Sequence, residues 1–180
     1  GLGDVYKRQG ESLAVKLSDF ADVSERIQYL VTQVEEITKI DNFGAYLTAM
    51  LEIDAFFMNE DRHTNNIAVI YNEKTQKYEL SPFFDQGLCM FADINQDYPI
   101  DQSLEYCLEK IEAKPFSSDF DIQLDAAEEL YGIQIGFQFT FKDIQIYLQK
   151  NSENYPREVI RRVEQLLRGQ MRKYGYLMKK

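Results

Sequence analysis

Apolar residues recur at helical spacing along most of the chain. Asp22 and Glu25 have the spacing of a capping box, which marks the start of a helix. The apolar stripe that follows consists of Ile27, Leu30, Val31, Val34 and Ile37. The pair Asp41-Asn42 interrupts this run and can cap a second helix from about Phe43. Because Leu47–Phe57 is apolar on nearly every face, the second helix is predicted to lie in the centre of a domain.

Four more helices are predicted after residue 100. They lie near Ser103–Ile111, from a cap at Ser118 to a stop at Gly132, from the cap pair Thr140 and Asp143 to Leu148, and from Pro156 in a first turn to Met171. No internal repeat and no domain boundary interrupts this helical pattern.

One short region departs from the helical pattern. Eight consecutive polar residues, Asn59–Asn66, separate the central helix from Ile67–Tyr71, which is predicted to be a buried strand. Asn72–Lys77 predicts a turn, and Tyr78–Leu80 predicts the returning strand of a hairpin, which Pro82 ends. The sequence therefore predicts a mainly α domain with one small β-hairpin.

Composition and charge narrow the range of partners. The 180 residues carry a net charge of −10 with the acids spread along the chain, whereas a nucleic-acid partner requires a clustered basic surface. No run of eighteen apolar residues could span a membrane. Cys89 and Cys107 are expected to be reduced core residues, and without a secretory signal the natural compartment is the cytoplasm. The basic stretch Arg157–Lys180 is spaced like the solvated face of a helix, although a surface for an acidic partner stays an alternative.

The polar octet and the segment after the hairpin carry the candidate chemistry. Asn66 follows Asp61 by five residues, and Asp85 follows Asp61 by twenty-four, across the hairpin. Because a hairpin returns the chain to its starting end, Asp85 is expected beside Asn66. One carboxylate and one amide oxygen suit Mg²⁺, and a separate carboxylate can take the proton of an attacking hydroxyl. Protein kinases use an Asp, an Asn and a second Asp in this order for phosphoryl transfer.

The run Asp61-Arg62-His63-Thr64-Asn65-Asn66 has the form Asp-x-His-x-x-Asn, in which the histidine follows the aspartate by two residues. In common protein kinases the histidine precedes the aspartate. The reversed order, together with Leu80–Asp85, resembles the HipA-type serine/threonine kinases, and phosphoinositide kinases share it. The likeness covers the chain from about Val23 by architecture, but only Asp61–Gly87 carries a motif.

This resemblance implies the helical C-terminal lobe of a protein-kinase-like fold, whose hairpin carries the catalytic and metal-binding loops. It implies Asp61 as the catalytic base, His63 as a second residue of the catalytic loop, and Asn66 and Asp85 as Mg²⁺ ligands. We expect His63 to brace the backbone or Asp85 rather than to transfer protons. ATP would be the phosphoryl donor and a protein Ser/Thr hydroxyl the acceptor, and an antitoxin partner would be possible.

The chain also departs from a complete kinase. It has no glycine-rich loop, and Lys16 lies too close to Asp61 to be the lysine that pairs with the ATP phosphates. Gly1–Gln9 resembles a translated adaptor sequence, so we expect only residues 10–180 to be kinase-like. The chain is thus expected to be an N-terminally truncated piece that is inactive without its other lobe.

Alternatives remain for single residues and for the whole chain. Asp61 could merely cap a helix end, Arg62 is expected to be structural, and Gly87 is expected to provide a positive φ after Asp85. The aromatic residues expected in the core rather than around a nucleobase are Phe56, Phe57, Phe83, Phe84 and Phe91. Competing functions are a lipid or small-molecule kinase, a non-catalytic helical interaction domain, and a metal-dependent hydrolase that uses Asp61, His63 and Asp85.

Overall fold

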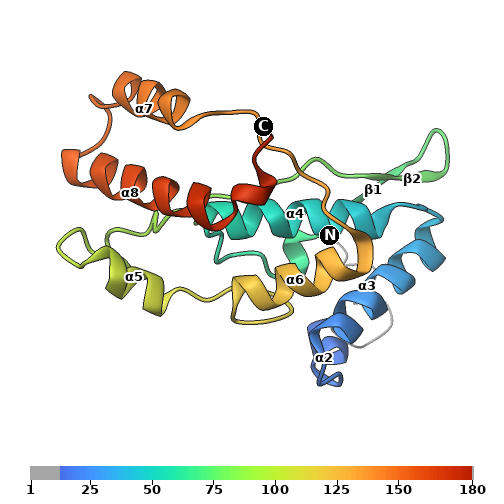
Figure 1. Ribbon diagram of the computed structural model, residues 1–180. Coiled ribbons are helices and arrows are strands. Elements are labelled where there is room, and N and C mark those ends of the chain that lie inside the picture. The colour runs from blue at the N-terminus through green and yellow to red at the C-terminus, as the bar shows by residue number, and fades with distance from the viewer. Residues whose placement is uncertain (1–12, 180) are drawn as a thin grey trace.

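The computed structural model describes residues 13–179, and the segment Gly1–Gln9 lies outside them. Its elements are α2 (Leu13–Ser18), α3 (Val23–Thr38), α4 (Phe43–Phe57), η1 (Thr64–Asn66), β1 (Val69–Asn72), β2 (Lys77–Leu80), α5 (Leu104–Lys110), α6 (Phe120–Tyr131), α7 (Phe141–Lys150), α8 (Arg157–Lys173) and η2 (Gly175–Leu177). The predicted mainly α architecture with one antiparallel hairpin is confirmed (Figure 1). Among the described helices, none combines the length and the apolar character that crossing a bilayer requires.

Two of the predicted helix caps are present as hydrogen bonds. The Asp22 side chain accepts a hydrogen bond from the Glu25 backbone N–H at the start of α3. Thr140 and Asp143 form a complete capping box at the start of α7, with each side chain bonded to the other residue's backbone N–H. Such caps satisfy the backbone donors of a first helical turn, which explains why the sequence locates these starts well.

Two other helix starts differ from the prediction by one residue. Asp119, not Ser118, caps α6, because its carboxylate accepts hydrogen bonds from two backbone N–H groups of the first turn. Pro156 precedes α8 as its cap instead of lying inside its first turn. Gly132 ends α6 with φ 75°, a backbone conformation that glycine adopts at little cost, as predicted.

Helix α4 runs through the middle of the molecule, with α6 and α3 packed along it (Figure 1). It is buried around most of its circumference, as its apolar sequence predicts. At Gly44 the ring of Tyr131 lies so close that an added Cβ would be 2.5 Å from two ring carbons. The first half of α4 therefore approaches the end of α6 at a position where only glycine fits.

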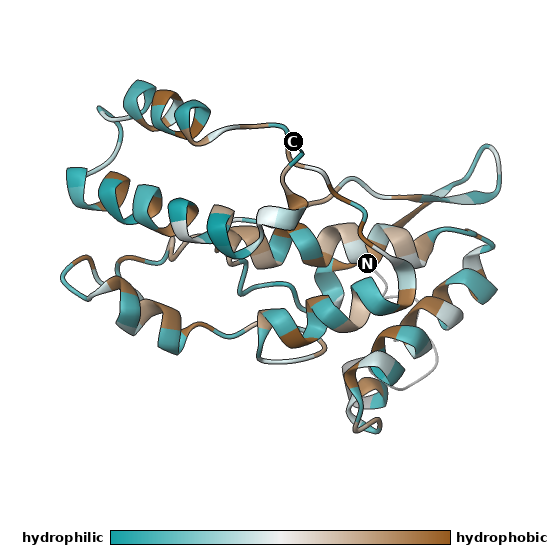
Figure 2. Cartoon of the chain, in the orientation of Figure 1, coloured by the Kyte–Doolittle hydropathy of each residue, from teal (hydrophilic) through white to brown (hydrophobic). Residues whose placement is uncertain are grey.

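The core consists of two clusters of buried side chains that α4 connects. The first joins α3 and α6 to the beginning of α4, and the second joins α5, α6, α7 and α8 to its end. Hydrophobic and hydrophilic residues alternate along α8, as an amphipathic helix over the second cluster requires (Figure 2). Ile37 departs from the predicted apolar stripe of α3 because its side chain is exposed.

The hairpin differs from the prediction in its bounds and burial. Its ladder pairs Val69 with Leu80 and Asn72 with Lys77, so Ile67 is buried but precedes the strand. Ile70 is 47% exposed, and Tyr71 is exposed as well. The prediction of a buried strand was wrong because a two-stranded ribbon that projects from a helical body has too little cover for both of its faces (Figure 1).

Two basic residues of the last helix are engaged within the protein. Arg162 is buried and donates hydrogen bonds to the carbonyl oxygens of Tyr98, Pro99 and Gln102. Lys173 pairs with Asp121 at 2.6 Å. Arg162 and Lys173 are therefore already bonded within the protein and are less available to bind an acidic partner.

Candidate functional site

The polar octet forms the loop between α4 and β1. Met58 ends α4 in the left-handed conformation, with φ 53°. The Asn59 backbone N–H then donates to the Asp54 carbonyl oxygen at 2.9 Å. The chain leaves the helix into the loop and enters β1 through the 3₁₀ turn η1. A rigid buried helix therefore anchors the loop at its start, which is a favourable placement for functional groups.

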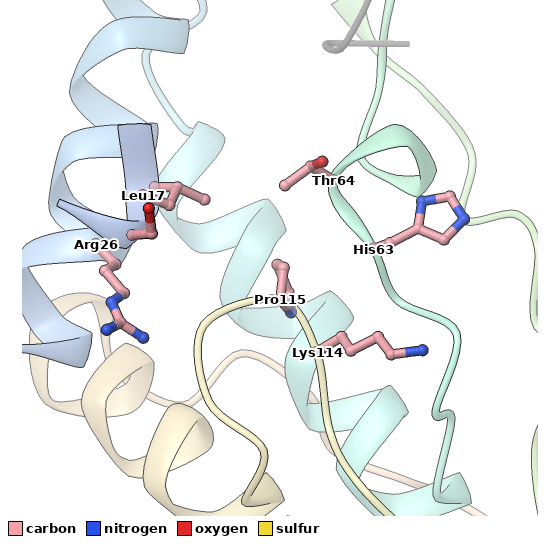
Figure 3. A pocket seen from close by; sticks show the side chains of 7 residues that line it. Leu17, Arg26, His63, Thr64, Lys114 and Pro115 are labelled. Carbon is pink, nitrogen blue, oxygen red and sulfur yellow. The ribbon is translucent and has the colours of Figure 1, made fainter. Parts of the chain in front are cut away.

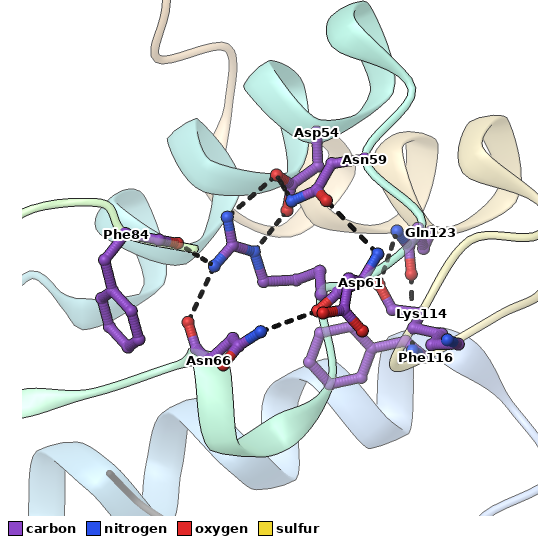
Figure 4. A network of polar contacts seen from close by, with 9 residues as sticks. Asp54, Asn59, Asp61, Asn66, Phe84, Lys114, Phe116 and Gln123 are labelled. Carbon is purple, nitrogen blue, oxygen red and sulfur yellow. Dashed lines mark hydrogen bonds and ion pairs between the residues drawn. The ribbon is translucent and has the colours of Figure 1, made fainter. Parts of the chain in front are cut away.

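Arg62 is the structural centre of this loop, as the sequence predicted. Its side chain and that of Asp54 are both 0% exposed, and Nε of Arg62 lies 2.6 Å from Oδ2 of Asp54. Nη2 of Arg62 donates to Oδ1 of Asp54 at 3.0 Å, and Nδ2 of Asn59 donates to the same oxygen at 2.8 Å (Figure 4). Sequence reasoning missed Asp54, although an acid within a largely apolar helix is a signal for a buried and paired charge.

Arg62 also ties the loop to the segment that carries Asp85. Its Nη1 atom donates to the carbonyl oxygen of Asn66 at 2.8 Å and to that of Phe84 at 3.0 Å (Figure 4). The Met90 backbone N–H donates to the Phe57 carbonyl oxygen, which fixes the same segment further along. One nitrogen atom thus brings the backbone of Asn66 close to the residue that precedes Asp85.

The side chain of Asp61 takes no part in holding the loop. Its carbonyl oxygen accepts hydrogen bonds from His63 N at 2.8 Å and from Nδ2 of Asn66 at 2.9 Å. Its backbone N–H donates to Oδ1 of Asn59 at 3.3 Å. Its carboxylate is 30% exposed and accepts no hydrogen bond from any residue between 13 and 179. Asp61 is therefore not the helix cap that its sequence position allows.

His63 contacts both the loop backbone and the side of Asp61. Its Nδ1 atom accepts a hydrogen bond from Asn65 N at 3.2 Å, which caps η1. In the neutral ring the proton then lies on Nε2, since Nδ1 acts as the acceptor. Nε2 is 4.0 Å from Oδ1 of Asp61, too far for a hydrogen bond. His63 thus braces the loop backbone, which is one of the two contacts that the sequence suggested.

The two predicted metal ligands each offer an oxygen atom. Nδ2 of Asn66 is occupied as a donor, whereas its Oδ1 accepts no hydrogen bond within the described part of the chain. Asp85 is exposed, and its carboxylate forms no ion pair with any described residue. Asp85 itself has φ 58°, whereas Gly87 does not have a positive φ, so the expectation for Gly87 was wrong. Aspartate and asparagine tolerate this left-handed region better than most residues.

The donor chemistry suits Mg²⁺ better than a transition metal. Across residues 13–179, no three or more His, Cys, Asp and Glu side chains are grouped to hold a metal ion. Asp61, His63 and Asp85 therefore form no preassembled centre of the kind that the hydrolase alternative requires. An amide oxygen and a carboxylate are hard ligands, and Mg²⁺ keeps several waters of its own.

Burial changes the acid–base properties of the groups beneath the loop. Burial raises the pKa of the Asp54 carboxyl, and the hydrogen bonds and charge of Arg62 oppose that rise. Burial and the negative charge of Asp54 raise the pKa of Cys89 to about 12. The thiol of Cys89 is therefore protonated at neutral pH and is a poor nucleophile.

Comparison of the chain with models of known protein families, with curated proteins and with solved structures finds no match. The assignment of a function therefore depends on the chemistry of this loop and on the resemblance of its motif.

Proposed function

We propose that this chain is the catalytic-loop half of a HipA-like kinase that transfers the γ-phosphoryl group of ATP to a protein Ser/Thr hydroxyl. In this proposal Asp61 is the base and Asn66 and Asp85 are ligands of Mg²⁺. The helical body with a hairpin between the two loops is compatible with the C-terminal lobe of a kinase-like fold.

One observation carries the proposal. The oxygen atoms of the Asp61 carboxylate, the Asn66 amide and the Asp85 carboxylate have no hydrogen-bonding partner among the described residues. The polar groups directly beneath them, on Asp54 and Arg62, are fully paired. Folding thus satisfies the supporting groups and leaves the oxygen atoms of three side chains, the exposed Asp85, the half-buried Asp61 and the buried Asn66, without a partner among the described residues. Acceptor atoms without a protein partner are what a metal and a hydroxyl require.

Each group has a separate task in the proposed reaction. Asp61 accepts a hydrogen bond from the acceptor hydroxyl, orients its oxygen and takes its proton as that oxygen bonds to phosphorus. The bond between the γ-phosphorus and its bridging oxygen breaks, and ADP leaves. Asn66 and Asp85 would hold Mg²⁺ through oxygen, and the ion would neutralise phosphate charge. His63 and Arg62 position the loop and transfer no proton.

The metal site can be tested without activity. We expect Mn²⁺, used as a paramagnetic substitute for Mg²⁺, to broaden the backbone NMR signals of Asn66 and Asp85 in the 180-residue chain. The exposed Asp101, which is not part of the proposed site, serves as the reference acid. Equal broadening at Asp101 and Asp85 would contradict the proposed site.

Phosphotransfer is tested in the longest natural chain that contains this sequence. Asp61→Asn is expected to reduce transfer from radiolabelled ATP by at least about a hundredfold, since general base catalysis contributes factors of this order. Folding should be unaffected because the Asp61 carboxylate bonds to nothing in the described structure. Unchanged transfer would refute the role of Asp61 as the base.

The acceptor class is tested by offering protein pools and lipid vesicles in parallel. Label transfer to lipid alone would favour the lipid-kinase alternative, for which the net charge of −10 is unfavourable at an anionic membrane. Binding of neither Mn²⁺ nor nucleotide would favour a non-catalytic interaction domain. The antitoxin partner stays a prediction of the resemblance, and the cytoplasmic location stays a prediction from the cysteine content.

A further inference from the structure

An open pocket of about 230 Å³ lies beside the catalytic loop. It is formed where α2, α3, the loop and the segment before α6 meet, and its lining residues are Leu17, Ser18, Arg26, His63, Thr64, Lys114 and Pro115 (Figure 3). Pockets for drug-sized ligands usually span about 300–1,000 Å³. This pocket therefore has room for one side chain or one phosphate group and is too small for a nucleotide.

The lining of the pocket has a positive electrostatic character. Arg26 and Lys114 contribute cationic groups, and no carboxylate is among the described side chains that line the pocket. In a chain with a net charge of −10 such a lining is unusual. A concave surface of one sign of charge concentrates ligands of the opposite sign.

Arg26 supplies charge from a fixed position. Its Nε atom donates to the Phe20 carbonyl oxygen at 2.8 Å, and Nη1 donates to the Phe116 carbonyl oxygen at 2.7 Å. Carbonyl oxygens do not neutralise the guanidinium, so its field persists in the pocket. Because these bonds also hold the segment that contains Lys114, the role of Arg26 is to shape the pocket.

Lys114 is the cation that can contact a ligand. The buried Gln123 holds its backbone by donating from Nε2 to the Lys114 carbonyl oxygen at 3.2 Å, and Oε1 of Gln123 accepts from Phe116 N. The ammonium group of Lys114 forms no hydrogen bond or ion pair with residues 13–179. Its side chain extends toward His63 (Figure 3). A fixed backbone with an unengaged ammonium group is suited to binding an anion.

We propose that this pocket binds an anionic group, a carboxylate or a phosphate, that the substrate carries next to its phosphoacceptor hydroxyl. The proposal rests on the proposed function, because it takes Asp61 as the base. His63 lines the pocket, and its Nε2 atom is only 4.0 Å from Oδ1 of Asp61. The His63 side chain therefore lies between an anion bound beside Lys114 and the proposed base, Asp61. The substrate class is a Ser/Thr segment with an acidic or phosphorylated neighbour.

The experiment is an NMR titration of the 180-residue chain with short peptides. One peptide carries Ser followed by two Glu residues, a second replaces these by Gln, and inorganic phosphate is the third probe. We expect the acidic peptide to shift the backbone signals of His63, Thr64 and Lys114 and to bind at least about fivefold more tightly than its Gln analogue. Lys114→Met should remove this preference, and the control Lys150→Met, at an exposed position on α7, should keep it.

The three probes separate the possible outcomes. Shifts with the acidic peptide alone identify a carboxylate neighbour, and shifts with phosphate at the same residues identify a phosphorylated one. Equal binding of the Glu and Gln peptides, with no shift from phosphate, would overturn the proposal. An equal loss of binding in Lys150→Met would also overturn it. Mn²⁺ broadening at Asn66 and Asp85 is independent of Lys114, so failure of the anion site and failure of the proposed function are distinguishable.

Discussion

Arg62 holds Asp54 through two parallel hydrogen bonds inside the protein, at 2.6 Å from Nε to Oδ2 and 3.0 Å from Nη2 to Oδ1. Arg62 belongs to the polar loop, and Asp54 belongs to the last turns of the central helix. The remaining Nη1 atom holds the carbonyl oxygens of Asn66 and Phe84. A single buried side chain therefore determines how the loop and the Asp85 segment lie relative to each other.

Replacing Arg62 should destabilise the protein strongly. Arg62→Met leaves the Asp54 carboxylate buried without its charged partner, and loss of one member of such a pair costs about 3–5 kcal/mol. The free energy of unfolding, measured by urea denaturation, is the readout. Arg168→Met is the control, because it removes a partly exposed pair with Glu164 and a contact with the Phe141 ring, which together should cost about 2 kcal/mol or less. Similar losses in the two variants would contradict the structural role of Arg62.

Two substitutions at Asp85 separate its charge from its backbone conformation. Asp85→Asn should preserve thermal stability, because asparagine also tolerates a φ of 58°. Asp85→Ala should lose about 1 kcal/mol, because alanine does not adopt this region readily. Both variants should lose Mn²⁺ broadening at Asn66, whereas Asp101→Asn should retain it. Retained broadening in Asp85→Asn would show that the carboxylate is not a ligand.

Two glycines on helices should respond to alanine in opposite directions. At Gly44 the new Cβ would lie 2.5 Å from the Tyr131 ring, and such overpacking costs about 1–3 kcal/mol. At the exposed Gly169 nothing lies within 4 Å, so alanine should stabilise α8 by about 0.5–1 kcal/mol. Urea denaturation of both variants is the measurement. Stabilisation by Gly44→Ala would show that α6 does not pack against α4 at this point.

Cys89 should react slowly with thiol reagents at moderately alkaline pH. Thiols react as thiolates, and a pKa of about 12 makes the thiolate fraction at pH 8 about a thousandfold smaller than for an ordinary thiol. Each thiolate is more nucleophilic at the higher pKa, so we expect alkylation at least about thirtyfold slower than for a free cysteine. The rate should rise about tenfold per pH unit up to the pKa. The denatured chain is the control, and a native rate equal to the denatured rate would contradict the partial burial of Cys89.

Much of the fold could be predicted because its signals are local. Capping residues such as Asp22 and Thr140 bond to backbone groups three positions away, so their effect depends on the adjacent sequence alone. The apolar pattern of α4 identified the central helix for a similar reason. A helix with apolar residues on every face removes them from water only when the whole helix is buried. The polar octet and its position before the hairpin were also visible in the sequence.

The sequence failed where the result depends on contacts between distant residues. It indicated a buried strand at Ile67–Tyr71, yet Ile70 and Tyr71 are exposed because the hairpin has no layer of structure over one side. It placed Phe84 in the core, whereas the side chain is exposed and the carbonyl oxygen makes the contact with Arg62. These outcomes depend on which surfaces the packed helices leave uncovered.

The sequence by itself determined the order of the helices, the hairpin and the placement of Asp61, Asn66 and Asp85 around it, because periodicity, caps and turns act over a few residues. Only the tertiary structure decided that the Asp61 carboxylate accepts no hydrogen bond from residues 13–179, that Asp54 neutralises Arg62, and that Lys114 reaches the side of the loop. The reason is that burying a charge is favourable only with a partner. Which residues become partners is set by how helices distant in sequence pack together.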